Sequence, residues 1–144
     1  MYQRIVVGTD GSDGAGMAVR HALRLAKETG STVHVVTAWQ PISALAMSGQ
    51  LGPAAPVPVD DGAWVEDLHR QVREQGEIVG VEVESHSVQG PAAHVILDVA
   101  EQVEADLVVI GNVGMHGLRG HLASVPNTVA HKAPCSVLLV PTSS

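Results

Sequence analysis

The chain has 144 residues, with fifteen acidic and eight basic side chains that give a formal net charge of −7. No cluster of lysine or arginine interrupts this acidic field, and aromatic residues make up only 2% of the chain. These features argue against nucleic acid or an anionic membrane as a partner. A domain of this length buries roughly 70% of the surface of its unfolded chain. We therefore expect one domain over residues 1–144.

Cysteine usage and the first residues bear on where the protein resides. The single cysteine, Cys135, excludes a disulfide within the chain and suits a reducing compartment. Residues 1–8 hold one arginine and a short apolar run that enters a glycine turn, which predicts neither a signal peptide nor a transmembrane segment. We therefore expect a cytoplasmic protein. Cys135 itself is interpreted as a small hydrophobic side chain rather than a nucleophile.

The first forty residues follow a strand, helix, strand pattern. Residues 4–9 are predominantly apolar and predict a buried strand, and a glycine turn leads from it into a helix that Gly30 ends. Residues 32–39 predict a second strand. Two strands joined by such a helix pair in parallel through a right-handed crossover.

Residues 40–60 interrupt the regular pattern with four prolines and predict a long surface loop. Helical periodicity resumes over residues 64–79. Alternating polarity over residues 81–88 predicts an edge strand with one wet face. Pro91 suits the first turn of the next helix.

The last third of the chain contains the stretch most suggestive of function. Residues 107–110 form a short apolar run rich in β-branched side chains, which predicts a strand buried on both faces. A glycine-rich loop follows, then a helix over residues 124–132 and a last strand over residues 136–140. Strand, glycine loop and helix start are typical of a phosphate site, although the loop lacks the Gly-Lys-Ser/Thr of a Walker motif.

Five strands alternating with four helices predict an α/β fold, a Rossmann-like open sheet of mainly parallel strands with helices on both faces. In such sheets ligands bind beyond the carboxyl ends of the strands, where the strand order reverses. The first and fourth strands are the natural flanks of that position. We therefore expect Asp10 to meet the loop that begins at Gly111.

The residues near these two strand ends suggest that the ligand is a mononucleotide. A carboxylate such as that of Asp10 repels phosphate but accepts hydrogen bonds from ribose hydroxyls, whereas the Ser124 hydroxyl and the Val125 N–H are phosphate donors at a helix start. The alternative is that Asp10 or Ser12 only caps the first helix, and that Ser124 only caps the last one. The eight histidines show no metal-ligand spacing, so we expect no metal site.

Four segments, in this order along the chain, resemble the universal stress protein family. They are Val6-Val7-Gly8-Thr9-Asp10-Gly11-Ser12, Val108-Val109-Ile110-Gly111-Asn112-Val113-Gly114, Ser124-Val125-Pro126-Asn127 and Ala133-Pro134-Cys135-Ser136-Val137-Leu138. The resemblance implies a sheet in the order 3-2-1-4-5 and a dimer formed through the last strand, Ser136 to Val140. An apolar strand at a sheet edge also has a physical reason to pair with its own copy, since a free edge invites aggregation.

One branch of this family binds ATP or AMP, and the resemblance implies which residues would do so here. Among them, Ala38 would offer backbone groups to the adenine edge. The expected cofactor is ATP or AMP, with or without Mg²⁺. The implied nucleotide-binding residues are Thr9, Asp10, Ala38, Ile110, Gly111, Asn112, Gly114, Ser124 and Val125.

The phosphate motif of the nucleotide-binding branch is altered in this chain. That branch has G-x-x-G, nine residues and then G-[S/T]. Here Gly111 and Gly114 supply the first part, but only eight residues separate Gly114 from the pair Ala123-Ser124, in which alanine replaces the glycine. Gly117 and Gly120 lie in this shorter segment and make it pliable.

We expect a stress-response regulatory protein that binds an adenine nucleotide at the glycine loop of the fourth strand, with no catalytic machinery in evidence. Three alternatives remain open. The first is a nucleotide-independent dimer that acts through contacts with an unidentified protein partner. The second is a slow ATPase, and the third is a dinucleotide-dependent oxidoreductase, although no substrate domain is apparent.

Overall fold

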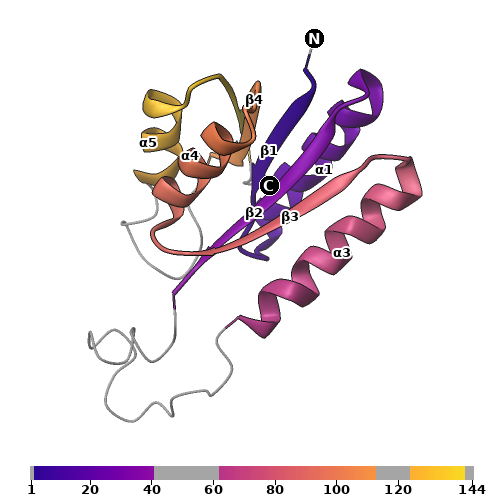
Figure 1. Ribbon diagram of the computed structural model, residues 1–144, viewed down its shortest axis with the longest axis horizontal. Helices are drawn as coiled ribbons and strands as arrows, with labels where there is room; N and C mark the ends of the chain where they lie inside the picture. The colour runs from indigo at the N-terminus through magenta and orange to yellow at the C-terminus, as the bar shows by residue number, and fades with distance from the viewer. Residues whose placement is uncertain (1, 41–61, 113–123, 142–144) are drawn as a thin grey trace.

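The computed structural model describes residues 2–40, 62–112 and 124–141. Within these ranges the chain forms a five-stranded sheet in the order β3-β2-β1-β4-β5, and all neighbouring strands run parallel (Figure 1). The strand order and the α/β class are those predicted. The strands are β1 (Arg4–Gly8), β2 (Thr32–Trp39), β3 (Val83–Gln89), β4 (Leu107–Gly111) and β5 (Ser136–Val140).

Helices cover both faces of the sheet (Figure 1). They are α1 (Asp13–Thr29), α3 (Ala63–Val79), α4 (Ala92–Gln102) and α5 (Ser124–Lys132). Successive residues of a strand point to opposite faces, so β1 contributes to two cores. Ile5 and Val7 pack with α1 and α3, whereas Val6 packs with α4 and α5. None of the described helices has the length and apolar character needed to cross a membrane.

The first helix begins and ends as the sequence predicts. The Ser12 side chain accepts a hydrogen bond from the Ala15 N–H at 3.2 Å and caps α1. At the other end, Gly30 has a φ of 74°, and its N–H donates to the Ala26 carbonyl at 2.8 Å. This left-handed conformation is the one that glycine adopts at no steric cost.

Several element boundaries differ from the sequence prediction by one or two residues. Pro91 precedes α4 as its cap residue instead of lying in the first turn, with extended backbone at φ −64° and ψ 137°. Strand β1 ends at Gly8, one residue early. Strand β3 begins at Val83 rather than at Val81, because the Val81 N–H donates to the Gly76 carbonyl at 2.8 Å and completes the turn that ends α3. The proline-rich loop predicted over residues 40–60 lies outside the described residues except for Gln40.

The two edges of the sheet are β3 and β5, as expected. Leu138 and Leu139 of β5 are 38% and 41% exposed, although both are large apolar side chains. The outer edge of β5 has no neighbouring strand within the described part of the chain. The prediction that a second copy covers this edge therefore remains a prediction.

Candidate functional site

The carboxyl ends of β1 and β4 meet at the centre of the sheet, because Val7 pairs with Val109 in the parallel register. A cavity of about 40 Å³ lies just beyond them. Five of the predicted nucleotide-binding residues line it, namely Thr9, Asp10, Ile110, Gly111 and Val125. Its other lining residues are Gly8, Ser12, Ala15, Ile96 and Pro126.

Asp10 organises the turn between β1 and α1. One carboxylate oxygen, Oδ1, accepts a hydrogen bond from the Ser12 N–H at 2.9 Å, and the Thr9 hydroxyl accepts one from the Gly11 N–H at 3.2 Å. Gly11 has a φ of 85°, which favours glycine. The second carboxylate oxygen of Asp10 makes no hydrogen bond to any described residue. Asp10 therefore shapes the turn and still presents at the site an acceptor that no described residue uses.

Thr9 is held by a buried network that the sequence analysis missed. Its N–H donates to the Val36 carbonyl at 2.9 Å, and its own carbonyl accepts from the Thr37 hydroxyl at 2.7 Å. The Thr37 oxygen lies 2.7 Å from Nε2 of His69. Because the hydroxyl proton goes to the Thr9 carbonyl, we infer that His69 Nε2 carries the hydrogen and donates to Thr37. The network fixes the end of β1 to β2 and to α3.

His69 is only 1% exposed, and its pKa is lowered to about 4, first by burial and then by the nearby Arg73 guanidinium. The ring is therefore neutral at physiological pH. The sequence did contain a sign that His69 is buried and bonded to a polar partner. His69 lies between Val65 and Val72 at helical spacings of four and three, on the apolar stripe of α3, where a polar ring needs a buried partner.

The β4 end of the site is described only in part. Gly111 is half-buried at the cavity, whereas Asn112 is exposed and does not line it, and the Asn112 N–H donates to the Val140 carbonyl at 2.9 Å. Helix α5 begins at Ser124, so the N–H groups of its first turn have no acceptor within the helix. Gly114 and the side chain of Ser124 lie outside the described residues.

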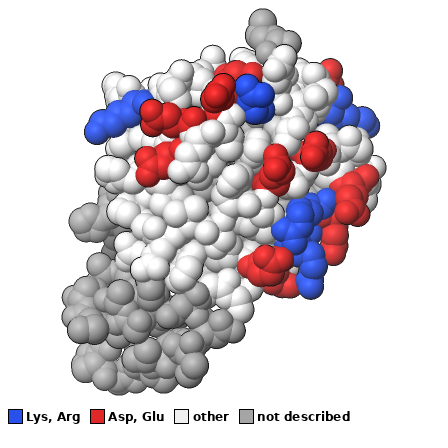
Figure 2. Space-filling model, in the orientation of Figure 1, with Lys and Arg blue, Asp and Glu red and all other residues white. Residues whose placement is uncertain are grey.

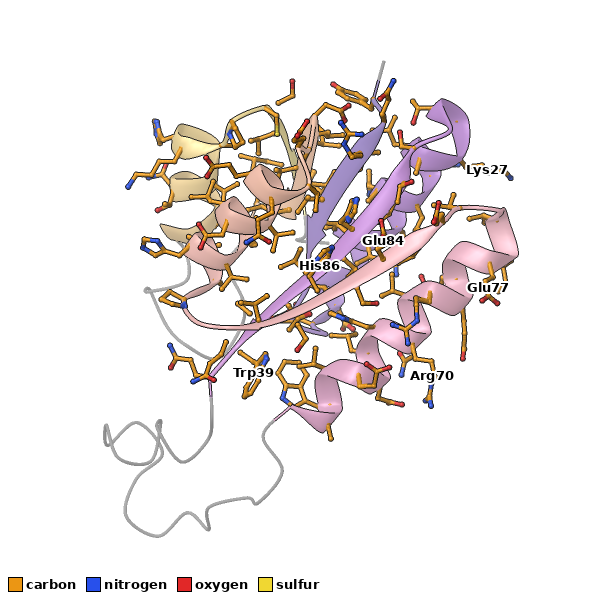
Figure 3. The ribbon with its side chains drawn as sticks, viewed as in Figure 1. Lys27, Trp39, Arg70, Glu77, Glu84 and His86 are labelled. Carbon is orange, nitrogen blue, oxygen red and sulfur yellow. The ribbon has the colours of Figure 1, made fainter. Side chains whose placement is uncertain are left out.

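Ala38 lies on β2, one strand away from β1 and the cavity. It is half-buried near the end of β2, where it pairs with Val88 of β3, and it does not line the cavity. Its neighbour Trp39 packs close to Gly62, the residue before α3 (Figure 3). The buried Trp39 Nε1 finds no hydrogen-bond acceptor in the described ranges.

Gly8 and Ile96 bring α4 close to the cavity. A Cβ atom at position 8 would lie 2.9 Å from Cδ1 of Ile96, so the missing side chain lets α4 approach the end of β1. The sequence placed Ile96 on an apolar helical stripe but gave no sign that it lines this cavity. Such a contact depends on how α4 crosses the sheet.

The described histidines and the cysteine give no sign of metal or nucleophile chemistry. Nδ1 of His34 lies 3.0 Å from Nε2 of His86, and Glu84 lies 3.7 Å from the other ring nitrogen of His34 (Figure 3). Burial lowers the pKa of both rings. No group of three or more His, Cys, Asp or Glu residues in the described ranges could hold a metal ion. Burial raises the pKa of the half-buried Cys135 thiol, in agreement with its interpretation as a small hydrophobic side chain.

A larger cavity lies elsewhere in the described part of the chain. It occupies about 790 Å³ between α1 and α3, and none of the predicted site residues lines it. The site at β1 and β4 is therefore supported by topology and chemistry rather than by the volume of the cavity.

Comparison with known proteins agrees with the resemblance in the motifs. The model of the universal stress protein family matches residues 1–141. A universal stress protein of Methanocaldococcus jannaschii is 33% identical over 143 residues, which cover 97% of this chain and 82% of that protein. One from Mycobacterium tuberculosis is 30% identical over 144 residues, with 99% and 98% covered.

Solved structures agree as well. The crystal structure of a universal stress protein in complex with cAMP is 33% identical, has a TM-score of 0.75 and is matched over 99% of both chains. A universal stress protein from Archaeoglobus fulgidus in complex with dAMP is 26% identical, with a TM-score of 0.69 and coverage of 96% of this chain and 97% of that one. Together with the strand order and the four motifs, these matches show that the chain belongs to the universal stress protein family.

Proposed function

We propose that this chain is a stress-response regulatory protein that binds an adenine nucleotide across the carboxyl ends of β1 and β4. The observation that carries the proposal is the shared cavity, where Asp10 from the turn after β1, Gly111 from β4 and Val125 from α5 come together. Two similar solved structures, at 33% and 26% identity, are complexes with cAMP and dAMP. These two ligands share an adenine, a sugar and one phosphate.

Each part of the nucleotide has a chemically suitable group in this chain. The free carboxylate oxygen of Asp10 accepts a hydrogen bond from a ribose hydroxyl. The N–H groups at the start of α5, together with Gly111 and Gly114, suit a phosphate. Backbone groups near Ala38 suit the adenine edge, one strand away. A small anion is the ligand that the start of α5 favours most directly.

The volume of the cavity limits how the nucleotide lies. About 40 Å³ is far below the roughly 300–1,000 Å³ of pockets that enclose small ligands. The nucleotide would therefore lie across the strand ends with only one group in the cavity. For ATP, a bound Mg²⁺ would offset the repulsion between the phosphates and an acidic chain of net charge −7.

Calorimetric titration of nucleotide-stripped protein tests the proposal. ATP, AMP and cyclic AMP are titrated separately, and ATP is also titrated with Mg²⁺, into the wild type and into Asp10→Asn. Asparagine keeps an oxygen for the Ser12 N–H but replaces the free acceptor by an NH₂ donor. We expect nucleotide binding to weaken at least ~10-fold, about 1.4 kcal/mol.

The matched control is Asp13→Asn, which makes the same change of charge three residues away at an exposed position that does not line the cavity. This variant should bind as the wild type does. Gly114→Ala, which adds a Cβ within the phosphate motif, should also weaken binding. No heat with any nucleotide up to about 1 mM would contradict the proposal and favour the alternative of a nucleotide-independent dimer.

A further inference from the structure

A groove separates α1 and α3, which lie on the same face of the sheet. Toward the carboxyl ends of the two helices it widens into the cavity of about 790 Å³. Apolar side chains of both helices line this part of the groove, including Met17, Leu23 and Val79, and Ile78 at its rim is 84% exposed. Apolar surface that continues from an exposed rim into a cavity is suited to contact with another molecule.

The groove continues toward the amino end of α1. A second cavity of about 310 Å³ lies between the same two helices and shares Met17, Arg20 and Gln75 with the first. Lining residues of the two cavities run from Thr9 to Glu28, so the groove follows the whole of α1. A helix of 17 residues, the length of α1, spans about 25 Å.

Three cations line one side of the groove. Arg20, Arg24 and Lys27 follow one another along α1 at spacings of four and three residues, so they form a row on one face of the helix about 10 Å long. They are three of the eight basic residues in an acidic chain. Figure 3 shows the side chain of Lys27 projecting outward near the carboxyl end of α1.

These three cations differ from the arginines of α3 in having no counter-ion among the residues that the structure describes. Arg70 pairs with Asp67 and Glu74, and Arg73 pairs with Glu66 at 3.0 Å. On the face shown in Figure 2, basic side chains along α3 lie beside acidic ones in the same way. Within the described residues, none of the three groove cations makes an ion pair. The groove therefore combines an apolar floor with three unpaired cations along one wall, where Glu28 is the acidic residue at the carboxyl end of the same helix.

We propose that this groove docks an amphipathic helix of a partner protein, with an apolar stripe on the groove floor and a row of carboxylates facing the three cations of α1. Acidic side chains at spacings of four and three residues on the docked helix would repeat the spacing of the cations. The length of the groove suits a partner helix of about 17 residues. The described helices of this chain already turn their apolar stripes toward the sheet, which argues against a second copy as the occupant.

A synthetic peptide of about 17 residues provides the probe. Leucines form one helical stripe, and glutamates flank it at spacings of four and three. The full-length protein is titrated with this peptide and with a matched peptide that carries lysine in place of glutamate, with fluorescence anisotropy as the readout. We expect the acidic peptide to bind and the basic peptide to bind at least ~10-fold more weakly. Binding of the acidic peptide should weaken as salt rises from about 0.1 to 1 M.

Two triple variants isolate the cation row. Arg20→Gln, Arg24→Gln and Lys27→Gln together remove the charges and keep similar stems, and we expect a loss of affinity of about 10-fold from three exposed ion pairs. The control removes three charges outside the groove, with Arg70→Gln, Arg73→Gln and Lys132→Gln. It should bind the acidic peptide as the wild type does. Thermal melting checks that both variants fold.

Several outcomes would overturn the proposal. These are no binding of the acidic peptide up to about 1 mM, equal binding of the two peptides, or unchanged affinity in the groove variant. Sedimentation gives a further test, because self-association lost only in the groove variant would assign the groove to a second copy. Binding of anionic vesicles lost only in that variant would assign the groove to a lipid surface. The large cavity shares no residue with the one at β1 and β4, so failure here leaves the nucleotide proposal intact.

Discussion

At the scale of single residues, the site depends on groups that hold Thr9 and Asp10 in place. Thr37 and His69 fix the Thr9 carbonyl, and the Asp10 carboxylate fixes the turn that follows. A buried polar network of this kind stabilises the fold only while every member keeps its partner. His69 is the titratable member, so the stability that this network contributes should depend on pH.

The free energy of unfolding should fall as the pH is lowered from about 7 toward 4. The pKa of His69 is about 4 in the folded protein, against 6.5 for a histidine in an unfolded chain, so the unfolded chain binds more protons between these pH values. Stability contributed by the neutral ring is complete above pH 6.5 and is lost progressively below it, to a limit of about 3 kcal/mol. Urea unfolding at a series of pH values measures this loss.

His69→Gln provides the comparison, since glutamine has an amide donor for the Thr37 hydroxyl and does not titrate. Its stability should fall less between pH 7 and pH 5 than that of the wild type. His34 and His86, whose pKa values are also lowered, contribute equally to both curves. Parallel curves for the two proteins would show that His69 is not the group responsible.

At the scale of secondary-structure elements, two features decide how the layers fit together. Gly76 lies inside α3, where glycine is unfavourable for a helix, and it allows the helix to approach β3. Strand β5 leaves an apolar edge, and Leu138 and Leu139 are exposed beside it. The glycine destabilises α3, and its packing on β3 would have to offset that cost. The apolar edge of β5 is exposed to water, and packing against another molecule would have to offset that cost.

Gly76→Ala should destabilise the protein, although alanine is the better helix former by about 1 kcal/mol. Its Cβ would lie 2.6 Å from Cγ2 of Val83 and 2.8 Å from the Val81 carbonyl oxygen. Backbone must move to relieve the second contact, and such overpacking costs about 1–3 kcal/mol. The control is Gly16→Ala in α1, where the new Cβ would meet only Nη1 of Arg20 at 3.7 Å. Thermal unfolding should show a lower Tm for the first variant and an equal or higher one for the second.

We propose that β5 pairs with β5 of a second copy, because a two-fold dimer would cover its apolar edge. Substituting Leu138→Glu and Leu139→Glu together should then shift the protein from dimer to monomer in analytical ultracentrifugation. Ile78→Glu, at an exposed apolar position on α3, is the control and should leave the dimer intact. A wild-type protein that sediments as a monomer would rule out this pairing.

At the scale of the whole molecule, the sequence predicts the fold better than it predicts the site. Hydrophobic periodicity places β2, α5 and β5 at their observed bounds, because each has a clear apolar pattern bounded by turn residues. The meeting of Asp10 with Gly111 follows from the strand order alone. The hydrogen bond between His69 and Thr37 joins positions 32 residues apart and depends on how α3 packs on the sheet, which no local pattern records. The place of Ile96 in the cavity likewise depends on how α4 packs on the sheet, and no local pattern predicts it.

The groove between α1 and α3 ends at the turn that bears the proposed nucleotide site, since Thr9 and Ser12 line both the narrower part of the groove and the cavity at β1 and β4. A ligand that reshapes this turn would alter the affinity for a helix docked in the groove. Thermodynamic linkage then requires the docked helix to change nucleotide affinity by the same factor. Such a protein would convert the concentration of a small metabolite into occupancy of a protein complex, with no chemical step between the two.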